Sequence, residues 1–80
     1  MKYSITVTLK KDVLDPQGKV VENTLKSMGL NSLKSVRQGK YFEIEVEEKR
    51  EDIAEKEVTQ MCEKLLVNLI IEDYKINKLE

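Results

Sequence analysis

The residues that most often perform covalent chemistry are nearly missing from this sequence. It contains no histidine and a single cysteine, Cys62. A serine, threonine or cysteine nucleophile needs a neighbouring base, which is usually histidine. Cys62 falls on an apolar helical stripe with Val58 and Leu65, and this position favours a buried, inert thiol. The sequence therefore predicts no catalytic residue in this chain.

Acidic side chains are abundant and could act as a general acid or bind a metal ion. Glu43, Glu45 and Glu47 alternate with apolar residues along one predicted strand. A second group surrounds the start of a predicted helix: Glu48, Glu51, Asp52, Glu55 and Glu57. Both roles require carboxylates that converge in a pocket. The spacing favours solvent-facing positions instead, so we expect neither an acid nor a metal site.

Two short polar segments are the candidate contact sites. In Asp15-Pro16-Gln17-Gly18 the free N–H groups of a helix start can bind an anion, although a plain capped turn is the simpler interpretation. Arg37-Gln38-Gly39-Lys40 places two cations on a turn that can contact an acidic partner or phosphate, and a solvated hairpin fits about as well. We predict partner contacts at Asp15, Pro16, Gln17, Gly18, Arg37, Gly39 and Lys40.

The overall charge argues against nucleic acid and anionic membranes as partners. The 80 residues carry 14 basic and 15 acidic side chains, which gives a net charge of −1. Nucleic-acid binders usually present a basic surface, and RNA-recognition modules display aromatic side chains where this chain has Glu43 and Glu45. One cysteine allows no internal disulfide, and no stretch resembles a signal peptide or a membrane span. We expect a cytoplasmic protein.

Hydrophobic periodicity predicts the elements that must position these residues. Apolar residues alternate from Tyr3 to Leu9, as in a half-buried strand. A helix follows, which begins at Asp15 and Pro16 and ends before Gly29. A short strand is expected at 33–36, and the hairpin turn at 37–40 leads into a third strand at 42–46. A longer helix over 53–69 and a last strand over 70–76 complete the chain.

The resulting order, β-α-β-β-α-β, predicts an α+β fold. We expect a ferredoxin-like two-layer sandwich, in which two helices cover one face of an antiparallel sheet and residues 1–80 form a single domain. A chain of this length buries only roughly 60% of its unfolded surface. Because it lacks the residues for a disulfide or a zinc site, self-association is the remaining source of stability. We therefore expect a homo-oligomer, either a dimer or a tetramer.

Three segments, taken together, resemble the PurS family, the small subunit of phosphoribosylformylglycinamidine synthase. They are Leu14–Gly18, Val36–Glu43 and Ile71–Tyr74, and their order and spacing extend the resemblance over essentially the whole chain. Two positions depart from the family pattern. Asp12 stands where the family often has glycine, in the loop before the first helix, and Leu69 stands where proline is common, which can let the second helix run longer.

The resemblance implies a role in purine biosynthesis. In that family's reaction a glutaminase subunit releases ammonia, and a large ATP-dependent subunit uses it to convert formylglycinamide ribonucleotide to the amidine. This chain would be a non-catalytic assembly subunit of that ATP-dependent C–N ligase, which uses glutamine as amido donor. It would bridge the two larger subunits, assist ammonia transfer and hold no cofactor, because ATP and Mg²⁺ are used by the synthetase subunit. The alternative is a small-ligand-binding regulatory module, which rests on fold analogy alone.

Overall fold

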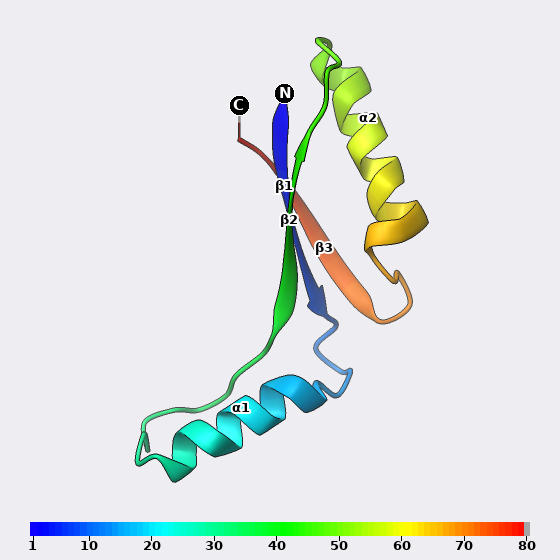
Figure 1. Cartoon of the computed structure of the whole chain (residues 1–80). Helices are drawn as coiled ribbons and strands as arrows, with labels where there is room; N and C mark the ends of the chain where they lie inside the picture. The colour runs from blue at the N-terminus through cyan, green and yellow to red at the C-terminus, as the bar shows by residue number, and fades with distance from the viewer. Residues whose placement is uncertain (80) are drawn as a thin grey trace.

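The computed structural model describes residues 1–79 and contains three strands and two α-helices. In chain order the elements are β1 (Lys2–Leu9), α1 (Pro16–Ser27), β2 (Gly39–Glu45), α2 (Glu51–Met61), the π-helical turn η1 (Cys62–Leu66) and β3 (Glu72–Lys78). The strands form one antiparallel sheet in the order β2-β1-β3 (Figure 1). The predicted α+β class with an antiparallel sheet is confirmed.

The core lies between the sheet and α2. Alternation along β1 directs Tyr3, Ile5 and Val7 to the face that α2 covers, and all three are buried. Thr6 and Thr8 point to the opposite face, where both are exposed. The remaining buried apolar residues come from the position just after β2, from α2 and from η1 with its flank: Val46, Ala54, Val58, Cys62 and Val67. The predicted burial of Cys62 is therefore confirmed.

The first helix begins and ends where its capping residues predicted. Asp15 precedes α1 in an extended conformation, and its side chain accepts a hydrogen bond from the Gly18 N–H. Pro16 is the first helical residue, where its fixed φ suits the helix and its missing N–H costs nothing. Gly29 follows the helix with φ 91°, a conformation that side chains disfavour.

The position of α1 differs from the prediction that both helices cover one face of the sheet. Figure 1 shows α1 beyond one end of the sheet rather than over it, and the molecule is elongated, with extents of 50 × 26 × 14 Å. The residues of α1 that are buried are Gly18 and Glu22, so the helix is held through a polar side. The helical spacing of Val20, Val21 and Met28 predicts an apolar face for this helix, but all three side chains are exposed. We call residues 10–38 the arm.

The strand predicted at 33–36 is wrong, and so is the hairpin turn predicted at 37–40. Residues 30–38 instead run back along α1 as an irregular segment, and Gly39 and Lys40 already belong to β2. The physical reason is visible at Val36, whose N–H donates to the Glu22 carboxylate (3.2 Å) rather than to a neighbouring strand. Within residues 1–79 the order is therefore β-α-β-α-β.

The second helix is also shorter than predicted. Helical structure runs from Glu51 through η1 and ends at Leu66, and Val67 is extended with φ −125° and ψ 133°. Leu69 therefore does not lengthen the helix, and β3 begins at Glu72 after a turn. None of the helices in residues 1–79 is both long and apolar enough to cross a bilayer.

Candidate contact site at the base of the arm

The two segments predicted as separate contact sites lie side by side. Asp15–Gly18 forms the start of α1, and Arg37–Lys40 passes it on the way into β2. The Gln38 N–H donates to Asp15 Oδ2 (2.8 Å), and the Gln38 side-chain amide donates to Gln17 Oε1 (2.9 Å). Residues that are more than twenty positions apart in sequence thus form one site, which we call the junction. The sequence identified both halves of the junction without indicating that they meet.

Asp15 is the central group of the junction. One carboxylate oxygen accepts the Gly18 N–H (2.9 Å) and caps α1, while the other accepts the Gln38 N–H. These two backbone hydrogen bonds, with a smaller contribution from the Arg37 cation, hold the pKa of Asp15 below its ordinary value despite some desolvation. An ionised Asp15 is therefore built into the junction, where it fixes the returning chain to the helix start.

Gly18 permits the close approach of the two segments. A Cβ atom at this position would lie 2.5 Å from an Asp15 carboxylate oxygen and 2.8 Å from the Val36 carbonyl oxygen. Both distances are shorter than a carbon atom tolerates, so a larger residue would push the returning segment away. This explains why a glycine occupies the first turn of a helix, where it is otherwise a poor helix former.

Arg37 binds the chain itself rather than projecting as a free cation. Its guanidinium Nη2 donates to three backbone carbonyl oxygens, those of Leu9 (3.2 Å), Lys10 (2.9 Å) and Val13 (3.4 Å). These carbonyls belong to the end of β1 and the loop after it. Arg37 therefore links the two connections between the sheet and the arm, and its charge remains at the exposed surface of the junction.

Lys40 closes the side of the junction that faces β3. Its ammonium lies 3.4 Å from Glu72 Oε2, and the other Glu72 oxygen accepts the Asn68 N–H (2.7 Å). Between Lys40 and Asp15 there is a shallow cavity of about 210 Å³. It is lined by Val7, Leu9, Asp15, Gln17, Gln38, Gly39, Lys40 and Glu72.

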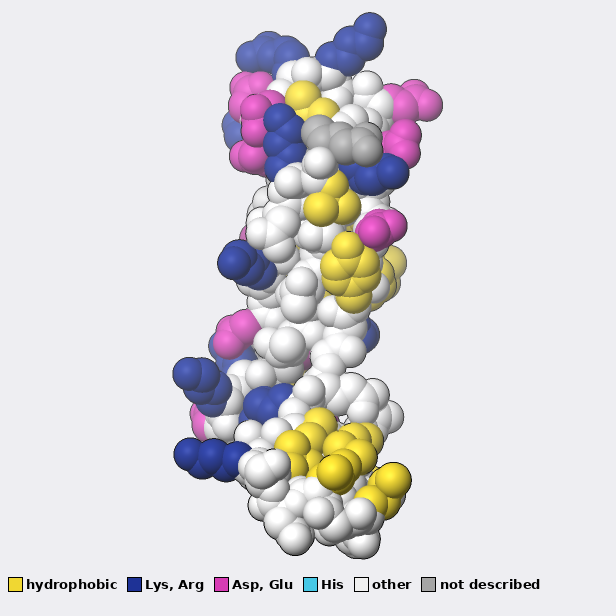
Figure 2. Space-filling model, turned by 90° about the vertical axis from the view of Figure 1, so that its left-hand side faces the viewer, with side chains coloured by type: hydrophobic (Ala, Val, Ile, Leu, Met, Phe, Trp, Pro, Cys, Tyr) yellow, Lys and Arg dark blue, Asp and Glu magenta, His cyan; other side chains and the backbone are white. Residues whose placement is uncertain are grey.

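A broader hollow continues from the junction onto the outer side of α1. It has a volume of about 470 Å³ and is lined by Pro16, Gln17, Val20, Val21 and Gln38. Val20 is 65% exposed, and Figure 2 shows apolar side chains gathered on this end of the molecule. Exposed apolar groups next to amide side chains can bury area and satisfy hydrogen bonds at once, a combination typical of protein interfaces.

Glu22 is a further residue of this region that was not predicted from the sequence. This carboxylate is only 5% exposed, and it accepts hydrogen bonds from Lys19 and Lys26 (both 3.2 Å) as well as from Val36 N–H. Its pKa is lowered by the lysines first and by the backbone donor second. The signal available in the sequence was the Lys19-Glu22-Lys26 spacing of i, i+3 and i+4 pairs. What the spacing did not contain was the returning chain that buries Glu22.

The arrangement can bind a surface but is poorly suited to covalent chemistry. Cys62, the single thiol, is fully buried in the core, and burial, aided by the nearby Glu63 charge, raises its pKa. A thiol in this environment is a weak nucleophile. Residues 1–79 contain no group of three or more His, Cys, Asp or Glu side chains placed to hold a metal ion.

Comparison with known proteins gives a consistent result. The family model described as PurS, phosphoribosylformylglycinamidine (FGAM) synthase, matches residues 2–80. The chain is 47% identical over 74 residues to the phosphoribosylformylglycinamidine synthase subunit PurS of Bacillus subtilis, covering 92% of this chain and 87% of that protein. It is 38% identical over 81 residues to the PurS subunit of Methanocaldococcus jannaschii, covering 99% and 98% of the two chains.

Solved structures agree with the sequence comparisons. A crystal structure of Bacillus subtilis PurS matches with a TM-score of 0.82 and 45% identity, covering 95% of this chain and 94% of that chain. A structure of PurLQS from Thermotoga maritima contains a chain that matches with a TM-score of 0.90 and 35% identity, covering 98% and 95%. The likeness includes the displaced α1, because these scores extend over nearly the whole chain. This chain therefore belongs to the PurS family of phosphoribosylformylglycinamidine synthase.

Proposed function

We propose that this chain is the non-catalytic assembly subunit of phosphoribosylformylglycinamidine synthase in de novo purine biosynthesis. It bridges the glutaminase and the ATP-dependent synthetase subunits and assists ammonia transfer between them. The observation that carries this proposal is the match, at a TM-score of 0.90 over 98% of this chain, to a chain in the structure of PurLQS from Thermotoga maritima. The complex is a ligase that uses glutamine as amido donor, and this chain is one of its subunits.

The proposal assigns no chemical step to this chain. We propose that residues 1–80 act as a single domain in the cytoplasm, that they hold no cofactor, and that ATP and Mg²⁺ are used by the synthetase subunit. The buried position and raised pKa of Cys62 support this assignment, since they make the thiolate costly to form. The chain also associates with itself, which supplies stability that its small core lacks.

Reconstitution tests the assembly role directly. The purified chain is mixed with the glutaminase and synthetase subunits, and synthesis of the amidine is measured with glutamine and, separately, with ammonia as nitrogen source. Leaving this chain out should abolish glutamine-dependent synthesis and spare ammonia-dependent synthesis, because only the former needs the subunits held together. Undiminished glutamine-dependent synthesis without this chain would contradict the proposal.

We propose that the junction and the adjoining side of α1 contact the larger subunits. The junction residues are Asp15, Pro16, Gln17, Gly18, Arg37, Gly39 and Lys40. Support comes from the exposed apolar surface at Val20 and Val21 beside the amides of Gln17 and Gln38. Because Asp15 and Arg37 bind the chain itself, their role is to hold this surface in place. Pro16, Gln17 and Lys40 are exposed and would meet the partner, although Gln17 also accepts from Gln38 and Lys40 pairs with Glu72.

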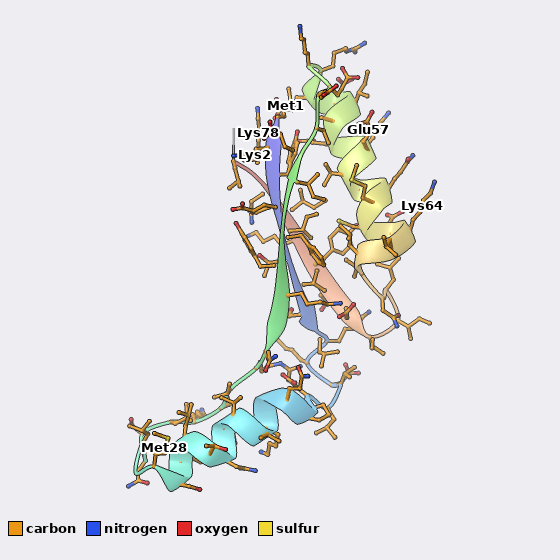
Figure 3. The ribbon with its side chains drawn as sticks, viewed as in Figure 1. Met1, Lys2, Met28, Glu57, Lys64 and Lys78 are labelled. Carbon is orange, nitrogen blue, oxygen red and sulfur yellow. The ribbon has the colours of Figure 1, made fainter. Side chains whose placement is uncertain are left out.

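A charge placed on this surface tests the assignment. Val20→Lys introduces an ammonium at the centre of the hollow and should weaken the complex at least tenfold, because an unpaired charge would be buried at the interface. Met28→Lys is the matched control: Met28 is also exposed (70%) but lies at the far end of α1 (Figure 3). Sedimentation of the mixed subunits measures both. If Val20→Lys and the unchanged chain bind the larger subunits with equal affinity, this surface is not the contact site.

A further inference from the structure

The arm is attached to the sheet only at its base. The chain enters the arm from β1 and leaves it into β2 (Figure 1). The two buried residues of α1, Gly18 and Glu22, face the returning segment and not the sheet. Gly18 lies against the Val36 carbonyl, and Glu22 accepts a hydrogen bond from the Val36 N–H. The arm is therefore held together internally, and its direction relative to the sheet must be fixed at its base.

The ladder between β1 and β2 stops where the arm begins. Its last pair is Thr8 opposite Gly39. Two residues farther on, the same register would place Arg37 opposite Lys10, but neither residue belongs to a strand. The two connections separate at this point, so the pairing of β1 with β2 does not set the angle at which the arm leaves the sheet.

The Arg37 side chain spans the gap between the two connections. Its Nη2 donates to the carbonyl oxygens of Leu9, Lys10 and Val13, at the end of β1 and in the turn that follows. Within residues 1–79 the arm has one other hydrogen bond to the rest of the molecule, from the Lys10 N–H to the Ile71 carbonyl (2.9 Å), and it holds only the first residue of the arm. Hydrogen bonds from a guanidinium are charge-assisted and directional. Arg37 is thus the side chain that ties the returning connection to the outgoing one.

We infer that Arg37 is a positioning residue that sets the direction of the arm and thereby couples ammonia release to ammonia use. The inference rests on the proposed function, in which the junction and the side of α1 contact the larger subunits. The 12 residues of α1 span about 18 Å, so a rotation of about 20° at the junction would move the far end of the helix by roughly 6 Å. A displacement of this size between the two larger subunits would let ammonia escape to solvent.

Distances between the arm and the sheet layer test the role of Arg37 directly. Spin labels are attached at Asn23→Cys on α1 and Glu55→Cys on α2 in a Cys62→Ala background, and both labelled positions are exposed. The labelled chain is diluted with unlabelled chain, so that each oligomer carries one labelled copy. Double electron–electron resonance should give a narrow distance distribution with Arg37 present. Arg37→Met should make it about twofold broader, because the arm can then rotate about its two backbone connections.

Two further variants make this measurement specific. Lys34→Met removes an exposed cation from the same returning segment and should keep the narrow distribution. Arg37→Lys should give an intermediate width, because an ammonium also has three N–H donors but sits on a shorter side chain. Equal widths with Arg37 and with Arg37→Met overturn the inference. It also fails if Arg37→Met removes the amide-exchange protection of Val36 and Gln38, since Arg37 would then hold the fold of the arm and not its direction.

The complete complex tests the consequence for ammonia transfer. With the chain at saturating concentration, the amidine formed per glutamine hydrolysed is measured together with the ammonia released to solution. Arg37→Met should lower this ratio at least about threefold and leave ammonia-dependent synthesis unchanged, because only the transfer depends on alignment. Arg37→Lys should regain part of the ratio, and Lys34→Met should retain all of it. Weaker assembly alone would not change a ratio measured at saturation.

The outcomes separate this inference from the proposed function. An unchanged ratio for Arg37→Met, despite a broader distance distribution, overturns the coupling role. Equal losses of the ratio for Arg37→Met and Arg37→Lys with narrow distributions would assign Arg37 to a direct contact with a partner, which also overturns it. Either result leaves the proposed function standing if glutamine-dependent synthesis still requires the chain.

Discussion

Asp15 and Glu22 show how two carboxylates fix a segment that has no regular structure of its own. Each carboxylate binds a backbone N–H of the returning chain, Gln38 for Asp15 and Val36 for Glu22. Hydrogen bonds to ionised acceptors are stronger than neutral ones, and they satisfy backbone donors that have no ladder partner. The charge of each carboxylate is therefore used to hold the arm together.

Removal of the Asp15 charge should destabilise the protein at neutral pH and matter less in acid. The pKa of Asp15 is lower in the folded protein than in the unfolded chain, so the stabilisation is fully present above its unfolded value and is lost as pH falls through the folded value. Asp15→Asn should lower the urea midpoint at pH 7, and the deficit should shrink as pH falls from about 4 toward 2.

The exposed neighbour Asp12 provides the matched control for this experiment. Asp12→Asn changes the net charge equally and should leave the urea midpoint nearly unchanged at both pH values. A deficit for Asp15→Asn that stays constant between pH 7 and pH 2 would show that the effect comes from the altered side-chain geometry and not from ionisation.

At the scale of elements, α1 and α2 have opposite relations to the sheet. α2 buries Ala54 and Val58 against Ile5 and its neighbours, so its amphipathic pattern is used within the chain. α1 has a comparable pattern, but its inward side is polar and its apolar residues face outward. The amphipathic period indicates that a helix has an apolar face, and it does not indicate which molecule covers that face.

Equivalent valines on the two helices should respond very differently to truncation. Val58→Ala removes two methyl groups from the fully buried core and should cost about 2 kcal/mol of unfolding free energy. Val20→Ala, on the exposed side of α1, should change the same quantity by less than about 0.5 kcal/mol in dilute solution. Chemical denaturation of both variants measures the difference. Equal costs would mean that α1 packs on the sheet as the sequence first suggested.

For the whole molecule, the elongated shape leaves a small core and a large exposed apolar surface. The fully buried residues are confined to the layer between the sheet and α2, while the arm adds length without adding to that core. Exposed large apolar residues occur both on the arm and beside the core, including Met28 just after α1 and Leu65 on η1. A surface of this kind is expected where a chain is completed by other subunits.

The stability of the isolated chain should therefore depend on its concentration. If folded copies associate and unfolded chains do not, a tenfold increase in concentration adds about 1.4 kcal/mol to the apparent free energy of unfolding per mole of dimer. Urea denaturation at about 1 µM and about 100 µM chain should show a clearly higher midpoint at the higher concentration. Superimposable curves at the two concentrations would contradict self-association.

The sequence by itself determined the local elements and the limits on chemistry. Alternation fixed β1, the Asp15-Pro16 cap fixed the start of α1, and the helical stripe placed Cys62 in the core, because these features depend on near neighbours and on the period of each element. The absence of histidine argued against a catalytic role for this chain. The three segments Leu14–Gly18, Val36–Glu43 and Ile71–Tyr74 indicated the family. What only the tertiary structure decided is where α1 lies, that 33–36 is not a strand, and that Asp15–Gly18 meets Arg37–Lys40. These three features depend on which side chains, distant in sequence, accept hydrogen bonds from the backbone N–H groups of the returning segment. They also depend on apolar helix faces that the chain itself does not cover.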